Sequence, residues 1–180
     1  MTILSLHECA ISWDSGSPEE TLRMGECLGR LLRPGDVVAL FGELGSGKTV
    51  LVRGMTAGLG CAASDVHSPS FTLINEYESP AEPGAMAGTR SRMAHVDLYR
   101  IQSEDEVPGI GWEHYLRSRY VVAVEWAERA LRWLPRDHLR VMLETLEGNQ
   151  RRLCVQATGS RSAQLVREWI VAGSLCVKAT

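Results

Sequence analysis

The sequence contains little lysine and no long apolar run, and each absence excludes a class of protein. Its lysines are Lys48 and Lys178, so the N-K-x-D motif that reads guanine in GTPases cannot form, and D-x-x-G is also absent. No stretch approaches the roughly 20 apolar residues of a membrane span, and the N-terminus lacks a secretory signal. We therefore expect no guanine specificity, no membrane partner and a cytoplasmic location.

An excess of positive charge is missing as well. The formal net charge is -3 at pH 7, which gives no broad electrostatic attraction to nucleic acid. This charge predicts no DNA binding and no more than an indirect or local connection with RNA.

The five cysteines show no C-x-x-C spacing of the kind that binds zinc or exchanges disulfides. Their number is odd and they are spread along the chain. Buried, reduced thiols are therefore expected, as in a cytosolic protein.

The apolar pattern predicts alternating strands and helices in a chain of 180 residues, a length that suits one domain. Strands are expected at 37–41, 70–77, 93–99 and 120–126, a hairpin at 139–146 and 152–158, and helices at 18–32, 48–59, 103–116 and 162–171. The helical segment 103–116 is expected to break around Pro108, residues 78–92 to form a surface loop, and residues 159–180 to form a C-terminal helix and tail. This order predicts a three-layer α/β domain with a mixed, mostly parallel central sheet and antiparallel edge strands.

The stretch GELGSGKT, residues 42–49, matches G-x-x-x-x-G-K-[ST] in full. An apolar strand precedes it and a helix follows, which is the context that this phosphate-binding motif requires. Backbone amides of such a loop face phosphate oxygens, Lys48 reaches the β and γ phosphates, and Thr49 offers its hydroxyl to Mg²⁺. The predicted nucleotide-binding residues are Glu43, Leu44, Gly45, Ser46, Gly47, Lys48 and Thr49. The whole chain, 1–180, is thus expected to be a single P-loop NTPase-like domain.

Two carboxylates end predicted buried strands. Glu125 follows VVAV and Asp97 follows MAHV. Because Mg²⁺ takes few protein oxygens in such sites, we assign Glu125 to the metal together with Thr49, and Asp97 to the γ-phosphate side. The roles of the two acids are interchangeable at this level. With Lys48 they form the predicted catalytic set, whereas His95 is expected to be a core residue.

Three kinds of activity fit these features. A small-metabolite kinase would need a lid with arginines, for which Arg90, Arg92 and Arg100 are candidates, but their segment lacks the apolar stripe of a helical lid. A nucleotide-gated scaffold would bind nucleotide without hydrolysing it. An ATPase that drives a conformational cycle in a partner protein needs neither a lid nor an acceptor pocket, and we favour it.

Four ordered blocks resemble the TsaE (YjeE) family, the ATPase component of bacterial tRNA threonylcarbamoyladenosine (t6A) synthesis. They are GELGSGKT, HSPSFTLINEY at 67–77, HVDLYR at 95–100 and VEWAER at 124–129. The resemblance implies ATP or ADP with Mg²⁺, weak activity in isolation, and assembly with the TsaD ligase and TsaB. It also implies that hydrolysis serves the cycle of that ligase.

The resemblance also implies residue roles. Lys48 and Thr49 match the family's nucleotide and metal positions, Asp97 matches the aspartate of H-x-D-L-Y-R, and Glu125 with Trp126 matches its E-W pair. Adenine contacts are expected from the segments that contain Thr21 and Arg151.

One stretch departs from the family pattern. SPSFTL looks like the switch-like S-P-T-Y-T-L, but Ser70 and Phe71 replace threonine and tyrosine. One hydroxyl and the aromatic ring remain, and the phenol and any hydrogen bond that it makes are lost.

Overall fold

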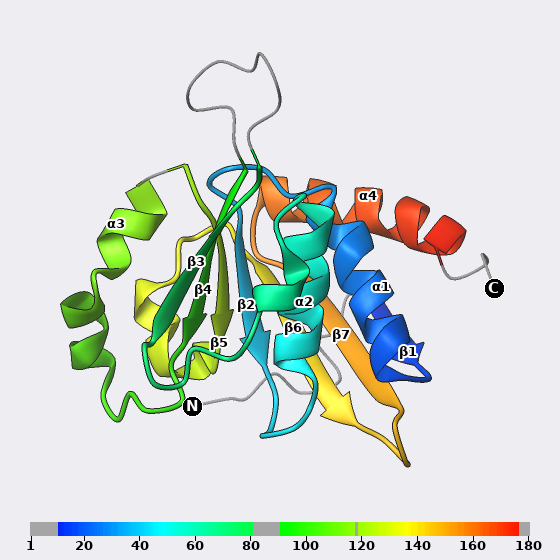
Figure 1. Ribbon diagram of the computed structural model, residues 1–180, viewed down its shortest axis with the longest axis horizontal. Coiled ribbons are helices and arrows are strands. Elements are labelled where there is room, and N and C mark those ends of the chain that lie inside the picture. The colour runs from blue at the N-terminus through cyan, green and yellow to red at the C-terminus, as the bar shows by residue number, and fades with distance from the viewer. Residues whose placement is uncertain (1–10, 81–90, 118, 177–180) are drawn as a thin grey trace.

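The computed structural model describes residues 11–80, 91–117 and 119–176, and within them a sheet of seven strands is flanked by helices (Figure 1). The strands are β1 (Ile11–Ser15), β2 (Val37–Phe41), β3 (Ile74–Glu78), β4 (Arg92–Asp97), β5 (Val121–Glu125), β6 (Leu139–Thr145) and β7 (Arg151–Ala157). The α-helices are α1 (Pro18–Gly29), α2 (Lys48–Gly58), α3 (Trp112–Arg117) and α4 (Ser160–Cys176), and 3₁₀ helices cover Ala63–Asp65, Glu104–Ile110 and Ala127–Trp133.

The sheet has a parallel centre and antiparallel edges. Its strand order is β1-β7-β6-β2-β5-β4-β3. β2 pairs in parallel with β5 and β6, and β4 pairs in parallel with β5. The pairs β1–β7, β6–β7 and β3–β4 are antiparallel. The predicted fold class is therefore confirmed.

Helices cover both faces of the sheet, which explains why its central strands are continuous apolar runs. α1, α2 and α4 pack on one face (Figure 1). Residues from the segment 98–134, which includes α3, pack on the other. Every residue of β2 and β5 is buried as a result, and this includes Glu125 at the end of β5.

Glycine pairs bring α1 and α2 into backbone contact. A Cβ atom added at Gly25 would lie 2.4 Å from the carbonyl oxygen of Leu51, and one at Gly54 would lie 2.1 Å from that of Leu22. Gly29 and Gly58, each four residues further along, make the same kind of approach. Only glycine allows two helices to meet this closely, so these glycines fix α2 against α1.

The predicted elements differ from the observed ones in three places. β1 was not predicted at all. The strand expected at 70–77 begins at Ile74, because a hydrogen bond of 2.6 Å from the Leu73 amide to the Pro69 carbonyl turns the chain before it. The segment 103–116 breaks at Gly111, whose φ is +79°, and not at Pro108.

Two further predictions concern segments that lie partly outside the described residues. Most of the predicted surface loop 78–92 lies at 81–90, outside the described residues, although Glu78 and Arg92 themselves belong to β3 and β4. The predicted C-terminal helix is α4, which begins at Ser160. The last residues of the predicted tail, 177–180, are also outside the description.

The cysteine prediction is correct for one thiol and wrong for two. Cys61 is free and buried, but Cys27, on one face of the sheet, and Cys154, on the other, each take part in a disulfide. The spacing of cysteines along the chain could not show which thiols the fold brings together. No helix in the described part of the chain has the length and apolar character needed to cross a membrane.

Candidate functional site

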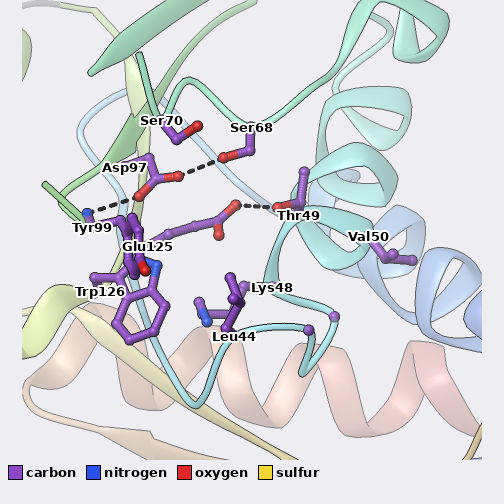
Figure 2. A pocket seen from close by; sticks show the side chains of 12 residues that line it. Leu44, Lys48, Thr49, Val50, Ser68, Ser70, Asp97, Tyr99, Glu125 and Trp126 are labelled. Carbon is purple, nitrogen blue, oxygen red and sulfur yellow. Dashed lines mark hydrogen bonds between the residues drawn. The ribbon is translucent and has the colours of Figure 1, made fainter. Parts of the chain in front are cut away.

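A pocket of about 360 Å³ opens where β2, β4 and β5 end. The carboxyl ends of neighbouring parallel strands meet at one edge of a sheet, and ligands of α/β proteins bind there. The pocket is lined by Leu44, Gly45, Gly47, Lys48, Thr49, Val50, Ser68, Ser70, Asp97, Tyr99, Glu125 and Trp126 (Figure 2).

The phosphate loop, residues 42–49, joins β2 to α2. Gly47 caps α2 in the left-handed region, with φ of +100°, and no side chain caps the helix. The first amides of α2 are therefore available to an anion. At Gly42 a Cβ atom would lie 2.3 Å from the carbonyl oxygen of Leu143 and 2.9 Å from Oγ of Ser46. The loop thus passes a neighbouring strand at a distance that only glycine permits.

Lys48 is buried at the base of the pocket, with 4% of its surface exposed. Its Nζ donates hydrogen bonds to the carbonyl oxygens of Gly42 (2.7 Å) and Glu43 (2.8 Å), and lies 4.1 Å from the centre of the Trp126 ring. Burial lowers the pKa of the Lys48 ammonium group, and the nearby carboxylates, Glu125 foremost, oppose this shift. Each of these contacts can be exchanged for phosphate oxygens.

Thr49 and Glu125, the two residues predicted to bind metal, are in direct contact. The hydroxyl of Thr49 donates a hydrogen bond of 2.8 Å to Oε1 of Glu125 (Figure 2). The same oxygen is 2.9 Å from Nε2 of His95, which is completely buried. The carboxylate is thus held in place from two sides.

Asp97 lies beside Glu125 because β4 and β5 pair in that register. Its Oδ2 accepts a hydrogen bond of 2.5 Å from the Ser68 hydroxyl, and its Oδ1 accepts one of 2.9 Å from the Tyr99 amide. Its own amide donates to the carbonyl of Leu73. Asp97 therefore ties the segment 67–73 to the end of β4 (Figure 2).

Strained backbone occurs beside the pocket. Among the described residues, positive φ outside glycine occurs at Leu73 (65°) and Trp126 (58°). Such conformations cost free energy and are typical of functional sites. Trp126 directly follows Glu125, and Leu73 ends the segment that Asp97 holds.

Phe71, the position where the chain departs from the family pattern, lies at the surface. Its side chain is 82% exposed, and the guanidinium carbon of Arg100 lies 4.0 Å from its ring centre. The aromatic ring is therefore retained as a stacking partner for arginine, a contact that needs no phenol.

The predicted nucleotide-binding residues fall into three groups. Leu44, Gly45, Gly47, Lys48 and Thr49 line the pocket, whereas Glu43 and Ser46 lie in the same loop but do not line it. The predicted adenine contacts lie elsewhere. Arg151 reaches back to the carbonyl of Gly45 at 3.3 Å. Thr21 is buried and hydrogen bonds with Ser15 at 2.8 Å.

Ser68, Tyr99 and Glu128 lie near the pocket but were not among the predicted site residues. Ser68 and Tyr99 bind Asp97, and a signal for both was present in the quoted blocks HSPSFTL and HVDLYR. No sequence motif indicated a role for Glu128. Burial raises the pKa of its carboxyl, the Lys48 charge opposes that shift, and its buried Oε2 has no hydrogen-bond partner in the described part of the chain.

The residues fit a nucleotide with Mg²⁺ on three observations. A Cβ atom at Gly42 would collide with the Leu143 carbonyl and the Ser46 hydroxyl and so distort the loop, the Ser46 hydroxyl is buried without a partner among the described residues, and Thr49 with Glu125 supplies hard oxygen donors. Within the described ranges no cluster of three histidine, cysteine or acidic side chains could hold a metal.

Comparisons with known proteins identify relatives over most of the chain. A family model described as "Threonylcarbamoyl adenosine biosynthesis protein TsaE" matches residues 15–153. Proteins named tRNA threonylcarbamoyladenosine biosynthesis protein TsaE are similar in sequence. The one from Bacillus subtilis is 33% identical over 88% of this chain and 92% of its own length, and the one from Treponema pallidum is 34% identical over 78% and 96%.

A solved structure is similar as well. The crystal structure of YdiB from Bacillus subtilis superposes with a TM-score of 0.67 at 28% identity, covering 89% of this chain and 94% of that one.

Proposed function

The chain belongs to the TsaE family, and on this premise we propose that it is the Mg²⁺-dependent ATP-binding and ATP-hydrolysing component of tRNA t6A synthesis. In this proposal it works as one cytoplasmic domain, drives the cycle of a TsaD-like ligase together with a TsaB-like protein, and meets tRNA only through them. The observation that carries it is the 2.8 Å hydrogen bond between Thr49 and Glu125 at the start of the phosphate-loop helix.

Thr49 and Glu125 would hold Mg²⁺, which would neutralise charge on the phosphates. Lys48 would give up the carbonyl oxygens of Gly42 and Glu43 and donate to the β and γ phosphates instead. The amides at the start of α2 would add their partial positive charge. Lys48 starts in a buried site, so little water separates its charge from the phosphates, and the interaction is correspondingly strong.

Asp97 is the residue that we assign to the γ-phosphate side. It would orient the attacking water or respond to loss of the γ-phosphate. Its hydrogen bond to Ser68 supports the second role, since a shift of Asp97 would be felt directly in the segment 67–73. Loops that are ordered by a γ-phosphate and released on hydrolysis are the usual device of nucleotide switches.

The arginines considered for a kinase lid support the partner-driven reading. Arg92 forms a salt bridge of 2.9 Å with Glu78 across the edge strands, and Arg100 stacks on Phe71. Arg90 lies outside the described residues. Neither described arginine lines the pocket, so both are engaged elsewhere on the surface.

The test is phosphate release from ATP by the purified chain, with and without TsaD-like and TsaB-like proteins from the same organism. We expect little turnover alone, a large increase with both partners, and loss of that increase in Glu125→Gln. Transfer of γ-phosphate to a small metabolite without partners would show a kinase instead. Nucleotide-dependent partner binding without any phosphate release would show a non-hydrolysing scaffold.

A further inference from the structure

His95 occupies a position in β4 from which it reaches the metal side of the pocket without lining the pocket. It lies opposite Ala123 in the register of β4 and β5. Residues at alternate positions of paired strands share a face, so His95, Asp97, Ala123 and Glu125 lie on one side of the sheet. The small side chain of Ala123 leaves room for the imidazole to approach Glu125.

The contact between His95 and Glu125 is a short polar contact in a dry environment. Nε2 of His95 is 2.9 Å from Oε1 of Glu125, and the exposed fractions of the two side chains are 0% and 4%. A hydrogen bond between such groups is not weakened by competition with water. Packing alone would not place a ring nitrogen at hydrogen-bonding distance from a carboxylate oxygen.

The other ring nitrogen indicates which tautomer makes the contact. Nδ1 of His95 is buried and has no hydrogen-bond partner among the described residues. An ionised carboxylate only accepts hydrogen bonds, so an unprotonated Nε2 would place its lone pair against a lone pair of Glu125. The tautomer that carries its proton on Nε2 therefore suits this environment, and it donates that proton to Glu125.

Oε1 of Glu125 thus accepts two hydrogen bonds, one from the Thr49 hydroxyl and one from His95. Two donors on one oxygen fix the rotation of the carboxylate. In metal sites, groups that hydrogen bond to a ligand in this way orient it, and their loss weakens metal binding about 10-fold to 100-fold.

We propose that His95 is a positioning residue for the metal site: it holds the carboxylate of Glu125 in the orientation that binds the ion beside Thr49. This inference rests on the proposed function. It assigns to His95 a role in metal affinity, in place of the core packing expected from the sequence.

The experiment measures Mn²⁺ affinity by electron paramagnetic resonance in the presence of a non-hydrolysable ATP analogue. It compares wild type with His95→Leu, which removes the donor, and with His95→Gln, whose amide nitrogen reaches about as far as Nε2. We expect His95→Leu to weaken Mn²⁺ binding about tenfold or more and His95→Gln to restore most of it. Affinity for the analogue in EDTA should stay within about twofold in all three proteins.

A packing control comes from the same strand. Met93 is fully buried on the same face of β4, two residues before His95, so Met93→Val should lower the melting temperature without changing Mn²⁺ affinity. If His95→Leu does not fold, His95→Asn serves in its place, since its shorter amide cannot reach Glu125.

The outcomes separate the two proposals. Wild-type Mn²⁺ affinity in a folded His95→Leu protein would overturn the positioning role and leave the proposed function intact. Equal weakening by His95→Leu and His95→Gln, or equal losses with and without metal, would also overturn it, because both would indicate packing. A wild-type protein that binds the analogue without any effect of Mn²⁺ would overturn the proposed function and this inference together.

Discussion

The ammonium group of Lys48 lies against the indole ring of Trp126, 4.1 Å from its centre, while it donates to two carbonyl oxygens of the phosphate loop. Three interactions thus hold a buried cation at the place where the motif requires it to meet phosphate. Trp126 can do this because its left-handed backbone turns the chain sharply after Glu125. These contacts keep the ammonium group at the base of the pocket, and in the proposed function it exchanges the two carbonyl oxygens for phosphate oxygens.

Replacing Lys48 by methionine should reduce ATP hydrolysis in the presence of partner proteins on the order of 100-fold, or about 2.7 kcal/mol. The substitution keeps the length of the side chain and removes the charge that contacts the phosphates. Steady-state phosphate release measures the effect. Arg30→Met, at the exposed C-terminal cap of α1, makes the same change in net charge and should leave the rate within about twofold. Comparable rates in both variants would remove Lys48 from the mechanism.

Replacing Ser68 by alanine should loosen the segment 67–73. The substitution removes the hydrogen bond to Asp97, and Ser68 is exposed, so global stability should change by less than about 1 kcal/mol. Hydrogen exchange followed by mass spectrometry should show faster exchange in peptides that contain this segment. Ser70→Ala, in the same segment and pocket, is the matched control. Unchanged exchange in Ser68→Ala would show that the contact to Asp97 does not hold the segment.

Replacing Gly54 by alanine should destabilise the protein by about 2–4 kcal/mol. The added methyl would lie 2.1 Å from the Leu22 carbonyl oxygen and 2.9 Å from the Glu26 amide nitrogen, so α1 and α2 would have to separate. Chemical denaturation monitored by circular dichroism gives the free energy of unfolding. Gly173→Ala is the control, because that helical glycine has open space around it and should gain a few tenths of a kcal/mol from helix propensity. Similar values for both variants would contradict the close packing of the two helices.

Cys61 should react slowly with alkylating reagents in the folded protein. Burial raises the pKa of its thiol from 9.0 to about 11, so at pH 8 only about 0.1% is thiolate, compared with about 10% in the unfolded chain. Peptide mapping after iodoacetamide treatment should show modification about 100-fold slower than in urea. Because the folded pKa is the higher one, the stabilisation from the neutral thiol is complete below pH 9 and is lost as pH rises towards 11. Equal rates in both states would contradict the shift.

The apolar pattern of the sequence correctly predicted the parallel strands at the centre of the sheet. The buried strand β5 gives a clear pattern because both faces are covered and every residue before Glu125 is apolar, and β4 places Met93, Ala94 and Val96 before Asp97. The hairpin of β6 and β7 was equally clear. The edge strand β1, ISWDS, was missed since five residues with one buried face give too little pattern.

The site was predictable only as far as it depends on local motifs. Lys48 and Thr49 follow from the phosphate-loop spacing, and Asp97 and Glu125 from strand ends. The contact between His95 and Glu125 depends on the register between two strands, and the glycines of α1 and α2 depend on how two helices cross. The spacing of residues along the chain indicates neither the strand register nor the helix crossing. Both became clear only from the three-dimensional structure.

The four glycines at the contact between α1 and α2 fix one wall of the pocket, which consists of the phosphate loop and the start of α2. The opposite wall is movable. Because these glycines bring the two backbones into contact, sliding or rotation of α2 against α1 would make backbone atoms collide. This opposite wall contains Ser68 and Ser70. It is held largely by polar contacts, which can be exchanged for other polar contacts at little cost in free energy. In the proposed function, a motion that reports the state of the nucleotide to another protein should therefore begin at Ser68 and Ser70, while the phosphate loop stays fixed.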